Sequence, residues 1–299
     1  MLIRVPATSA NLGPGFDCVG MALNLYNYIE FEVLEKYNDL SIDIKGEGDK
    51  NLKKDNTNLV YQAFSKVFLD LGKPIPGIKF SLKNNIPLSR GLGSSSAAII
   101  GGLMAANYLL DNILDESQLL DLAAGFEGHP DNIAPALLGG IVICTVNGQK
   151  IIYKKMNPPK TLSCSLLIPD YELSTQKARE ILPTSIPLKD AVFNIGRMAF
   201  FVHAINSGDL ELLKLAIDDK LHQPYRKQLI PGLSDVFKKA KELNILGIAI
   251  SGAGPSIIVF HKKEETDNLP QLLDVIGQYG INSRLINLEP VEEGAKILD

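Results

Sequence analysis

A glycine- and serine-rich turn at residues 87–97, PLSRGLGSSSA, runs directly into a strongly apolar segment. Residues 94–110 are apolar over most of a helical surface, which predicts a helix of about four turns packed deep in a core. A flexible linker would be followed by polar sequence, so we expect a rigid turn instead. Gly91 and Gly93 allow tight turning and close approach of another group. Backbone N–H groups at such a helix start can hold a phosphate.

The turn does not belong to the two most familiar phosphate-binding motifs. GxxxxGK[ST] occurs nowhere in the chain, and the turn lacks the third glycine and the downstream acidic residue of GxGxxG. Taken alone, the turn therefore also fits a purely structural helix cap. Other segments have to decide between the two interpretations.

Strand-like and helical patterns are mixed along the whole length, which predicts an α+β class rather than an alternating parallel fold. The double proline at 158–159 can continue neither element, so it is the predicted boundary between domains at 1–157 and 158–299. Expected strands are at 2–7, 25–35, 41–48, 78–87, 139–146, 149–156, 165–170 and 281–289, with two more inside 247–260. Expected helices are at 56–71, 94–110, 115–128, 190–206, 209–221, 233–243 and 269–280.

Composition excludes several classes of function. The net charge of −4 gives no general footprint for nucleic acid or an anionic membrane. Cys18, Cys144 and Cys164 are far apart and lack metal-ligand spacing, which indicates reduced thiols. The first residues show no signal-peptide pattern, and no apolar run reaches the roughly 20 residues of a membrane helix. We expect a cytoplasmic protein.

Two further glycine turns lie next to strands: PATSANLGPGFD at 6–17 and SGAGPS at 251–256. With PLSRGLGSSSA they resemble the three motifs of the GHMP small-molecule kinases, whose middle motif reads P-x-x-x-G-L-G-S-S-x-A. Within that family, VPATSANLGPGFD, EGHPDNIAPALLGG (127–140) and SGAGPS look like the homoserine kinases. The resemblance covers essentially the whole chain.

The resemblance implies a two-domain GHMP kinase fold. The N-terminal, ATP-binding domain would be like ribosomal protein S5 domain 2, and the C-terminal domain would be ferredoxin-like. It also implies transfer of the γ-phosphoryl group of ATP to L-homoserine in threonine biosynthesis, with Mg²⁺. Family members are often dimers, so a homodimer is a candidate assembly.

The resemblance assigns residues to the nucleotide and the metal. Glu127 with Ser94 or Ser95 would bind Mg²⁺, which prefers oxygen ligands and keeps several waters. Which of the two serines binds the metal stays open. The predicted nucleotide-binding residues are Pro87, Leu88, Ser89, Arg90, Gly91, Leu92, Gly93, Ser94, Ser95, Ser96 and Ala97.

An amino-acid substrate needs a carboxylate for its ammonium group and a guanidinium for its carboxylate. The family resemblance implies Asp17 for the first role and Arg179 and Arg226 for the second. The predicted substrate-binding residues are Asn11, Asp17, His129, Asn132, Arg179 and Arg226, and the predicted catalytic residues are Glu127, Asn132 and Arg179.

No dedicated catalytic base is expected, although Asp131, Asn132 and His129 are candidates. His203 and His222 are interpreted as structural. Three alternatives stay open: a family kinase acting on mevalonate or a related alcohol, a silent ligand sensor, and an S5-like nucleic-acid binder. The alcohol substrates lack an ammonium group, so Asp17 with two arginines would serve no purpose there.

Overall fold

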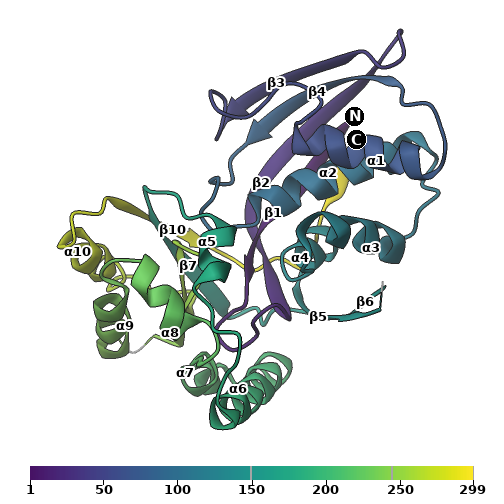
Figure 1. The fold of residues 1–299 in the computed structure, drawn as a ribbon. Helices are drawn as coiled ribbons and strands as arrows, with labels where there is room; N and C mark the ends of the chain where they lie inside the picture. Colours follow the sequence, from purple (N-terminus) through teal and green to yellow (C-terminus); the bar gives the residue numbers. More distant parts are fainter. Residues whose placement is uncertain (149, 244, 299) are drawn as a thin grey trace.

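The computed structural model describes residues 1–148, 150–243 and 245–298, and two β-sheets organise the chain (Figure 1). The first sheet has seven strands in the order β11-β1-β2-β4-β3, with β5 on β2 and β6 on β5. Among the strand pairs that the structure describes in this sheet, only β3 and β4 are parallel. Its strands are β1 (Leu2–Ala10), β2 (Val19–Leu34), β3 (Leu40–Gly46), β4 (Gly77–Asn84), β5 (Ile141–Asn147), β6 (Lys150–Met156) and β11 (Lys296–Leu298).

Helices from the first half of the chain lie together on one side of this sheet (Figure 1). They are α1 (Leu59–Asp70), α2 (Ser94–Leu109), α3 (Glu116–Glu127) and α4 (Ile133–Leu138). In α2, alanine, isoleucine, leucine and two glycines are buried, so the helix is surrounded by protein. Gly102 permits this packing, because a Cβ there would lie 2.2 Å from the Val60 carbonyl oxygen of α1. The expected buried helix after the turn is confirmed.

The second sheet is a four-stranded antiparallel sheet in the order β10-β7-β9-β8. Helices α9 and α10 pack on it, and α6 and α7 lie at the lower end of the molecule in Figure 1. The elements are β7 (Leu162–Pro169), β8 (Gly247–Ile250), β9 (Ile257–Lys262), β10 (Ser283–Leu288), α5 (Thr175–Glu180), α6 (Leu188–Ser207), α7 (Leu213–Ala216), α8 (Gln223–Arg226), α9 (Leu233–Glu242) and α10 (Gln271–Gly277).

The chain end returns to the first sheet, where β11 pairs with β1 and Ile297 lies opposite Ile3. The prediction placed all of 158–299 in the C-terminal domain. The last strand of this range, β11, lies in the first sheet, with the strands of the N-terminal half. The boundary at 157/158 itself stays a prediction. Val5 of the first sheet and Leu166 of the second belong to one apolar core, whereas Leu167 and Val259 of the second sheet belong to a separate one.

The helix predicted at 209–221 is wrong in its extent. A 3₁₀ turn at Leu210–Leu212 is followed by α7, which ends at Ala216. The reason lies in Asp219, whose carboxylate accepts the backbone N–H groups of Leu221, His222 and Gln223 and so begins α8 instead. Gln149, the first residue of the strand predicted at 149–156, lies outside the described residues.

In the described part of the chain, no helix combines the length and apolar character needed to cross a membrane.

Candidate active site

The three glycine turns, far apart in the sequence, meet at one place. Ser251 Oγ lies 2.7 Å from the carbonyl oxygen of Gly91 and 2.8 Å from Ser9 Oγ. Asn11 Nδ2 donates to the carbonyl oxygen of Gly252 at 2.9 Å. The first and last turns therefore hold the middle one in place from both sides, which a flexible linker would not allow.

The backbone N–H groups at the start of α2 are not capped by a side chain of the described residues. Gly93 is the N-cap residue, with φ of 69°. The first backbone N–H groups of a helix have no partner within the helix and carry the positive end of its dipole. Ser94, Ser95 and Ser96 supply these groups at the wall of a cavity. The arrangement has the chemistry of a phosphate site.

Replacing Gly93 with alanine is expected to cause a large loss of function. The added Cβ would lie 1.9 Å from Thr8 Oγ1 at a positive φ that alanine disfavours. We expect activity to fall by on the order of 100-fold and the unfolding midpoint to drop, from strain of about 1–3 kcal/mol. Steady-state ADP release and thermal unfolding measure both effects.

Gly125→Ala is the matched control, because it lies inside α3 and a Cβ there meets no atom within 4 Å. It should keep full activity and gain up to about 1 kcal/mol of stability. Wild-type activity and stability in Gly93→Ala would show that the turn does not need its left-handed conformation.

The cavity in front of α2 has a volume of about 290 Å³. Both halves of the chain line it, with residues as far apart in the sequence as Asn11 and Ala253. Its lining residues are Asn11, Asp17, Pro87, Ser89, Arg90, Gly91, Leu92, Gly93, Ser94, Ser95, Ser96, Glu127, His129, Asp131, Asn132, Thr175, Arg179, Arg226, Gly252 and Ala253.

Two predicted nucleotide-binding residues are not part of this lining. Ala97 is fully buried in the core. Leu88 Cδ1 points toward Gly48 instead. Thr175, Gly252 and Ala253 line the cavity without having been predicted. Gly252 and Ala253 belong to the glycine turn SGAGPS that the sequence analysis identified, whereas nothing in the sequence singled out Thr175.

Glu127, at the end of α3, reaches the start of α2. Ser96 Oγ donates to Glu127 Oε2 at 2.7 Å, and Ser95 Oγ donates to Glu127 Oε1. Burial raises the pKa of Glu127, although the two serine hydrogen bonds partly oppose the shift. Between the two predicted candidates, the Glu127 contact favours Ser95 over Ser94. A carboxylate beside a hydroxyl is an oxygen donor set that fits Mg²⁺.

Asp17 and Arg179 form a bidentate pair across the cavity. Arg179 Nη2 lies 2.7 Å from Asp17 Oδ1, and Arg179 Nη1 lies 3.0 Å from Asp17 Oδ2. The hydrogen bonds from Arg179 raise the pKa of that guanidinium. Asp17 and Asn11 have φ of 56° and 70°, a left-handed backbone that Asn and Asp adopt more readily than most residues. One anionic and one cationic group therefore face the same space.

Arg226 lies deeper, with 2% of its surface exposed. Its Nη1 donates to the carbonyl oxygen of Gly252 at 2.9 Å, and its Nε donates to that of Ala178 at 3.1 Å. Burial, and then the charge of Arg179, lower the pKa of Arg226 to about 10, so it stays charged at neutral pH. The ring of Phe16 lies near both guanidiniums, with centroid distances of 5.7 Å and 5.2 Å. The sequence did not single out Phe16.

His129 and Asp131 stand next to Asp17. His129 Nδ1 lies 3.0 Å from Asp131 Oδ1. Burial alone would lower the pKa of His129, but the hydrogen bond and charge of Asp131 outweigh it and raise the pKa. One ligand atom from each of Asp17, His129 and Asp131 lies within 4.8 Å of the others, an arrangement that suits a cation.

Asn132 is oriented by a residue that the prediction missed. Thr8 Oγ1 donates to Asn132 Oδ1 at 2.8 Å, which leaves the amide NH₂ as a donor at the cavity. Thr8 is fully buried. The predicted catalytic amide is therefore held in one orientation by the first glycine turn.

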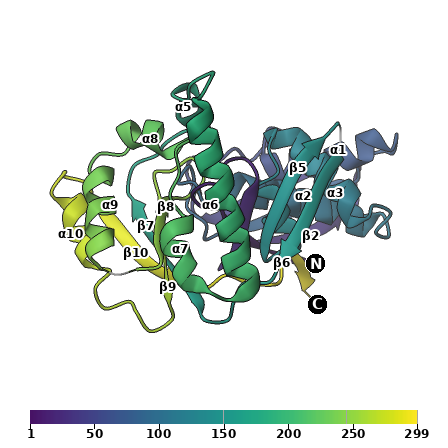
Figure 2. The same ribbon diagram turned by 90° about the horizontal axis from the view of Figure 1, so that it is seen from below.

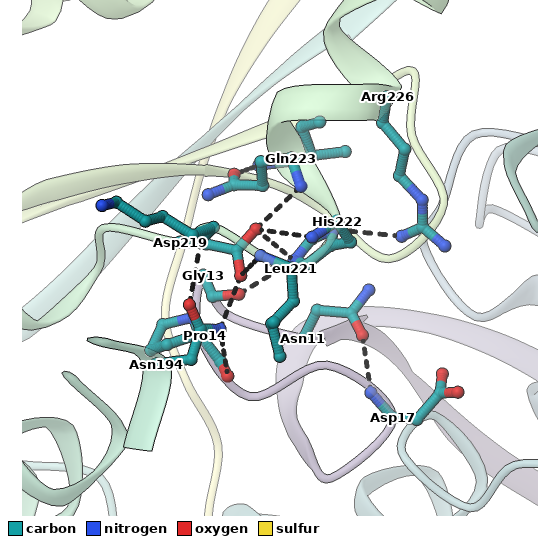
Figure 3. A network of polar contacts seen from close by, with 12 residues as sticks. Asn11, Gly13, Pro14, Asp17, Asn194, Asp219, Leu221, His222, Gln223 and Arg226 are labelled. Atoms are coloured by element: carbon teal, nitrogen blue, oxygen red, sulfur yellow. Dashed lines mark hydrogen bonds and ion pairs between the residues drawn. The ribbon is translucent and has the colours of Figure 1, made fainter. Parts of the chain in front are cut away.

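A buried polar network supports the substrate side of the cavity (Figure 3). His222 Nε2 lies 2.8 Å from the carbonyl oxygen of Gly13, and Arg226 Nη1 lies 3.3 Å from His222 Nδ1. A carbonyl can only accept and a guanidinium can only donate, so the ring is neutral with its proton on Nε2. Burial lowers the pKa of His222, in agreement. His222 thus links Arg226 to the first turn, as a structural residue.

Asp219 is the centre of this network (Figure 3). Its carboxylate accepts four N–H groups, one of them from Asn194 Nδ2 at 2.7 Å and three from the backbone at 221–223. Asn194 Nδ2 also donates to the carbonyl oxygen of Pro14 at 3.2 Å. Asp219→Asn would replace one carboxylate oxygen, which accepts hydrogen bonds, with an NH₂ group, which would then face N–H donors. We expect a loss of about 1–3 kcal/mol in the free energy of unfolding.

Urea unfolding measures this loss, and Asp209→Asn is the control because Asp209 is exposed. Equal stability of the two variants would contradict the role given to Asp219.

Family models match both halves of the chain: the GHMP kinases N terminal domain over residues 58–140 and the GHMP kinases C terminal domain over residues 201–274. The homoserine kinase of Carboxydothermus hydrogenoformans is 43% identical over 293 residues, 98% of this chain and 95% of that one. That of Moorella thermoacetica is 40% identical over 99% of both chains. The chain belongs to the homoserine kinase family of the GHMP kinases.

Solved structures agree with this family. The crystal structure of homoserine kinase from Cytophaga hutchinsonii has a TM-score of 0.89 and 31% identity, and it covers 100% of this chain and 97% of its own. A mevalonate kinase at 17% identity has a TM-score of 0.71 over 98% of this chain and 100% of its own, which shows the shared fold alone. The predicted two-domain GHMP kinase fold is confirmed. As a family member the chain is a small-molecule kinase that uses ATP.

Proposed function

We propose that this chain transfers the γ-phosphoryl group of ATP to the side-chain hydroxyl of L-homoserine, giving O-phospho-L-homoserine for threonine biosynthesis. The observation that carries the proposal is the shared cavity, in which the open start of α2 and Glu127 face the Asp17–Arg179 pair. One cavity would thereby hold both a phosphate, at the start of α2, and a zwitterion, at Asp17 and Arg179. Cytoplasmic location is kept as a prediction.

At the phosphate end, the N–H groups of Ser94, Ser95 and Ser96 would bind the terminal phosphates of ATP. Because α2 is buried in the core, these donors are fixed before the nucleotide arrives. Phosphoryl transfer depends mostly on positioning and on neutralising charge, so fixed donors lower the barrier without rearrangement.

Glu127 and Ser95 would hold Mg²⁺, as their oxygen donors and their place beside the phosphate site suggest. When bound, the ion would neutralise phosphate charge. Glu127 must be ionised for this role. Its two serine hydrogen bonds favour the ionised form against the cost of burial.

At the substrate end, the ammonium group of homoserine would lie against the carboxylates of Asp17 and Asp131. Its carboxylate would be bound by the guanidiniums of Arg179 and Arg226. In the present structure Asp17 and Arg179 neutralise each other. The ammonium group of homoserine can replace Arg179 as the partner of Asp17, and its carboxylate can replace Asp17 as the partner of Arg179. An alcohol without an ammonium group leaves Asp17 unpaired.

We propose no dedicated base for the hydroxyl proton, which would leave to a phosphate oxygen or to water. The carboxylates of the cavity are already engaged: Asp17 by Arg179, Asp131 by His129, and Glu127 by two serines. Asp131→Asn should then lower turnover less than 100-fold. A loss of several orders of magnitude with intact substrate binding would make Asp131 the base.

A coupled ADP-release assay with L-homoserine, mevalonate and shikimate tests the proposed function. We expect a preference for L-homoserine of at least about 1,000-fold in kcat/KM, because a site whose polar groups bind a group of the substrate strongly rejects an acceptor that lacks that group. Preference for an acceptor without an ammonium group would overturn the assignment. ATP binding without ADP release for any acceptor would support a sensor instead.

A further inference from the structure

The aromatic ring of Phe16, in the first glycine turn, lies close to three side chains on the substrate side. The Cζ atoms of Arg179 and Arg226 lie 5.7 Å and 5.2 Å from its centroid. The ring of His222 stacks on it, with the two centroids 5.2 Å apart and the planes at 24°. Phe16 does not line the cavity itself. We propose that Phe16 is a positioning residue, which keeps both guanidiniums directed at the carboxylate of the acceptor. This role rests on the proposed function, in which the acceptor is an amino acid.

The two arginines come from separate segments of the chain. Arg179 belongs to α5 and Arg226 ends α8, and these short helices lie near each other in Figure 2. The Nε group of Arg226 donates to the carbonyl oxygen of Ala178 in α5. Phe16 is supplied by a third segment, between β1 and β2. One ring therefore contacts two guanidiniums that no shared helix holds together.

Two guanidiniums at one place repel each other. Burial lowers the pKa of Arg226 most, and the positive charge of Arg179 lowers it further. Arg226 is fixed by its hydrogen bonds to two carbonyl oxygens. Among the described residues, the side chain of Arg179 hydrogen-bonds to Asp17 alone. The position of Arg179 therefore depends on Asp17 and on the ring of Phe16.

Substrate binding removes one of these two contacts. In the proposed function, the ammonium group of the acceptor replaces Arg179 as the partner of Asp17. Repulsion from Arg226 would then favour a position of Arg179 outside the cavity. The face of an aromatic ring carries partial negative charge and attracts a cation within about 6 Å of its centroid. Phe16 offers such a ring to both guanidiniums, so Arg179 stays beside Arg226, where the substrate carboxylate can reach both.

Phe16 is itself held by the network that fixes Arg226. His222 Nε2 donates to the carbonyl oxygen of Gly13 at 2.8 Å, and Arg226 Nη1 donates to His222 Nδ1 at 3.3 Å. Because the ring of His222 is neutral, it stacks on Phe16 without adding a third positive charge. The orientation of the Phe16 ring is therefore set before the substrate binds.

Two substitutions separate the aromatic face of Phe16 from its bulk. Phe16→Leu removes the face and keeps a large apolar side chain, whereas Phe16→Tyr keeps the face. We expect Phe16→Leu to raise KM for L-homoserine about 10-fold and to leave KM for ATP within about three-fold. Phe16→Tyr should behave like the wild type. An equal rise of both KM values in Phe16→Leu, or the same loss in Phe16→Tyr, would assign Phe16 to packing alone and overturn the proposal.

Phe237→Leu is the matched control for Phe16→Leu. The Nζ atom of Lys227 lies 5.2 Å from the centroid of the Phe237 ring, and Phe237 does not line the cavity. This variant also loses an aromatic face beside a cation, and it should change neither KM.

Fluorination of the Phe16 ring tests the same role without a large change of shape. Site-specific replacement of Phe16 by a trifluorinated phenylalanine withdraws electron density from the ring face and weakens its attraction for cations. We expect KM for L-homoserine to rise several-fold, and to rise less with a monofluorinated phenylalanine, at an unchanged unfolding midpoint. A KM that does not increase with the number of fluorine atoms overturns the proposal, even where Phe16→Leu fails to fold.

Calorimetric titration with L-homoserine in the presence of ATP analogue gives a dissociation constant that does not depend on turnover. If the wild type prefers another amino acid, the proposed function fails, and the same Phe16 variants are compared with that amino acid. If the wild type uses L-homoserine with an affinity that neither Phe16→Leu nor fluorination changes, the proposal for Phe16 fails alone. A wild type that binds no acceptor with a carboxylate overturns both.

Discussion

Glu127→Gln is expected to lower kcat/KM for ATP by roughly 1,000-fold, a loss of about 4 kcal/mol. Glutamine has the size of the native side chain and can still contact Ser95 and Ser96. What it lacks is the negative charge that would bind Mg²⁺ beside the phosphate site. Steady-state ADP release across a Mg²⁺ titration measures the effect. Glu116→Gln, at the other end of α3, is the control and should behave like the wild type.

The same variant makes a prediction about pH. Because burial raises the pKa of Glu127, its ionised fraction declines on acidification sooner than that of an ordinary glutamate. Metal-dependent activity of the wild type should therefore fall as the pH drops through this raised value. Glu127→Gln should lack that dependence. An activity within a few-fold of wild type, with the acid decline intact, would remove Glu127 from the metal site.

Arg179→Lys is expected to raise KM for L-homoserine by on the order of 100-fold and to leave KM for ATP within about three-fold. Arg179 presents two parallel donors to a carboxylate, as its pair with Asp17 shows. A lysine presents a single ammonium group and cannot hold a carboxylate in the same plane. Initial rates over a grid of both substrates separate the two KM values.

Arg284→Lys is the control for this change, because Arg284 is 53% exposed, pairs with Glu47 and does not line the cavity. It should leave both KM values unchanged. An equal rise in KM for ATP and for homoserine in Arg179→Lys would mean that Arg179 serves the phosphates, and would contradict its place in the substrate site.

The positions of the glycine turns could be predicted from the sequence because their cause is local. Gly91 and Gly93 adopt positive φ and approach other backbone and side-chain atoms closely, which other residues do not allow. The buried helix after them follows from its apolar composition. Their convergence was available only through the family resemblance, since no local property of residues 6–17 says that they contact residue 252.

The supporting residues could not be predicted, because their roles depend on contacts between distant segments. Thr8 orients Asn132, 124 positions away. Asp219 looked like part of a helix, yet α7 ends at Ala216, and the Asp219 carboxylate collects four N–H groups from two other segments. The predicted nucleotide, metal and substrate roles stay predictions, although 16 of the residues assigned to them, among them Ser95, Asp17 and Arg226, line one cavity.

A crystal structure of the full chain with L-homoserine, Mg²⁺ and a non-hydrolysable ATP analogue would show both proposed binding sites occupied at once. We predict the terminal phosphate at the N–H groups of residues 94–96, with the metal ion on Glu127 and the homoserine charges on Asp17 and Arg179. Nucleotide bound away from the start of α2, or homoserine outside the cavity between the two sheets, would contradict the account.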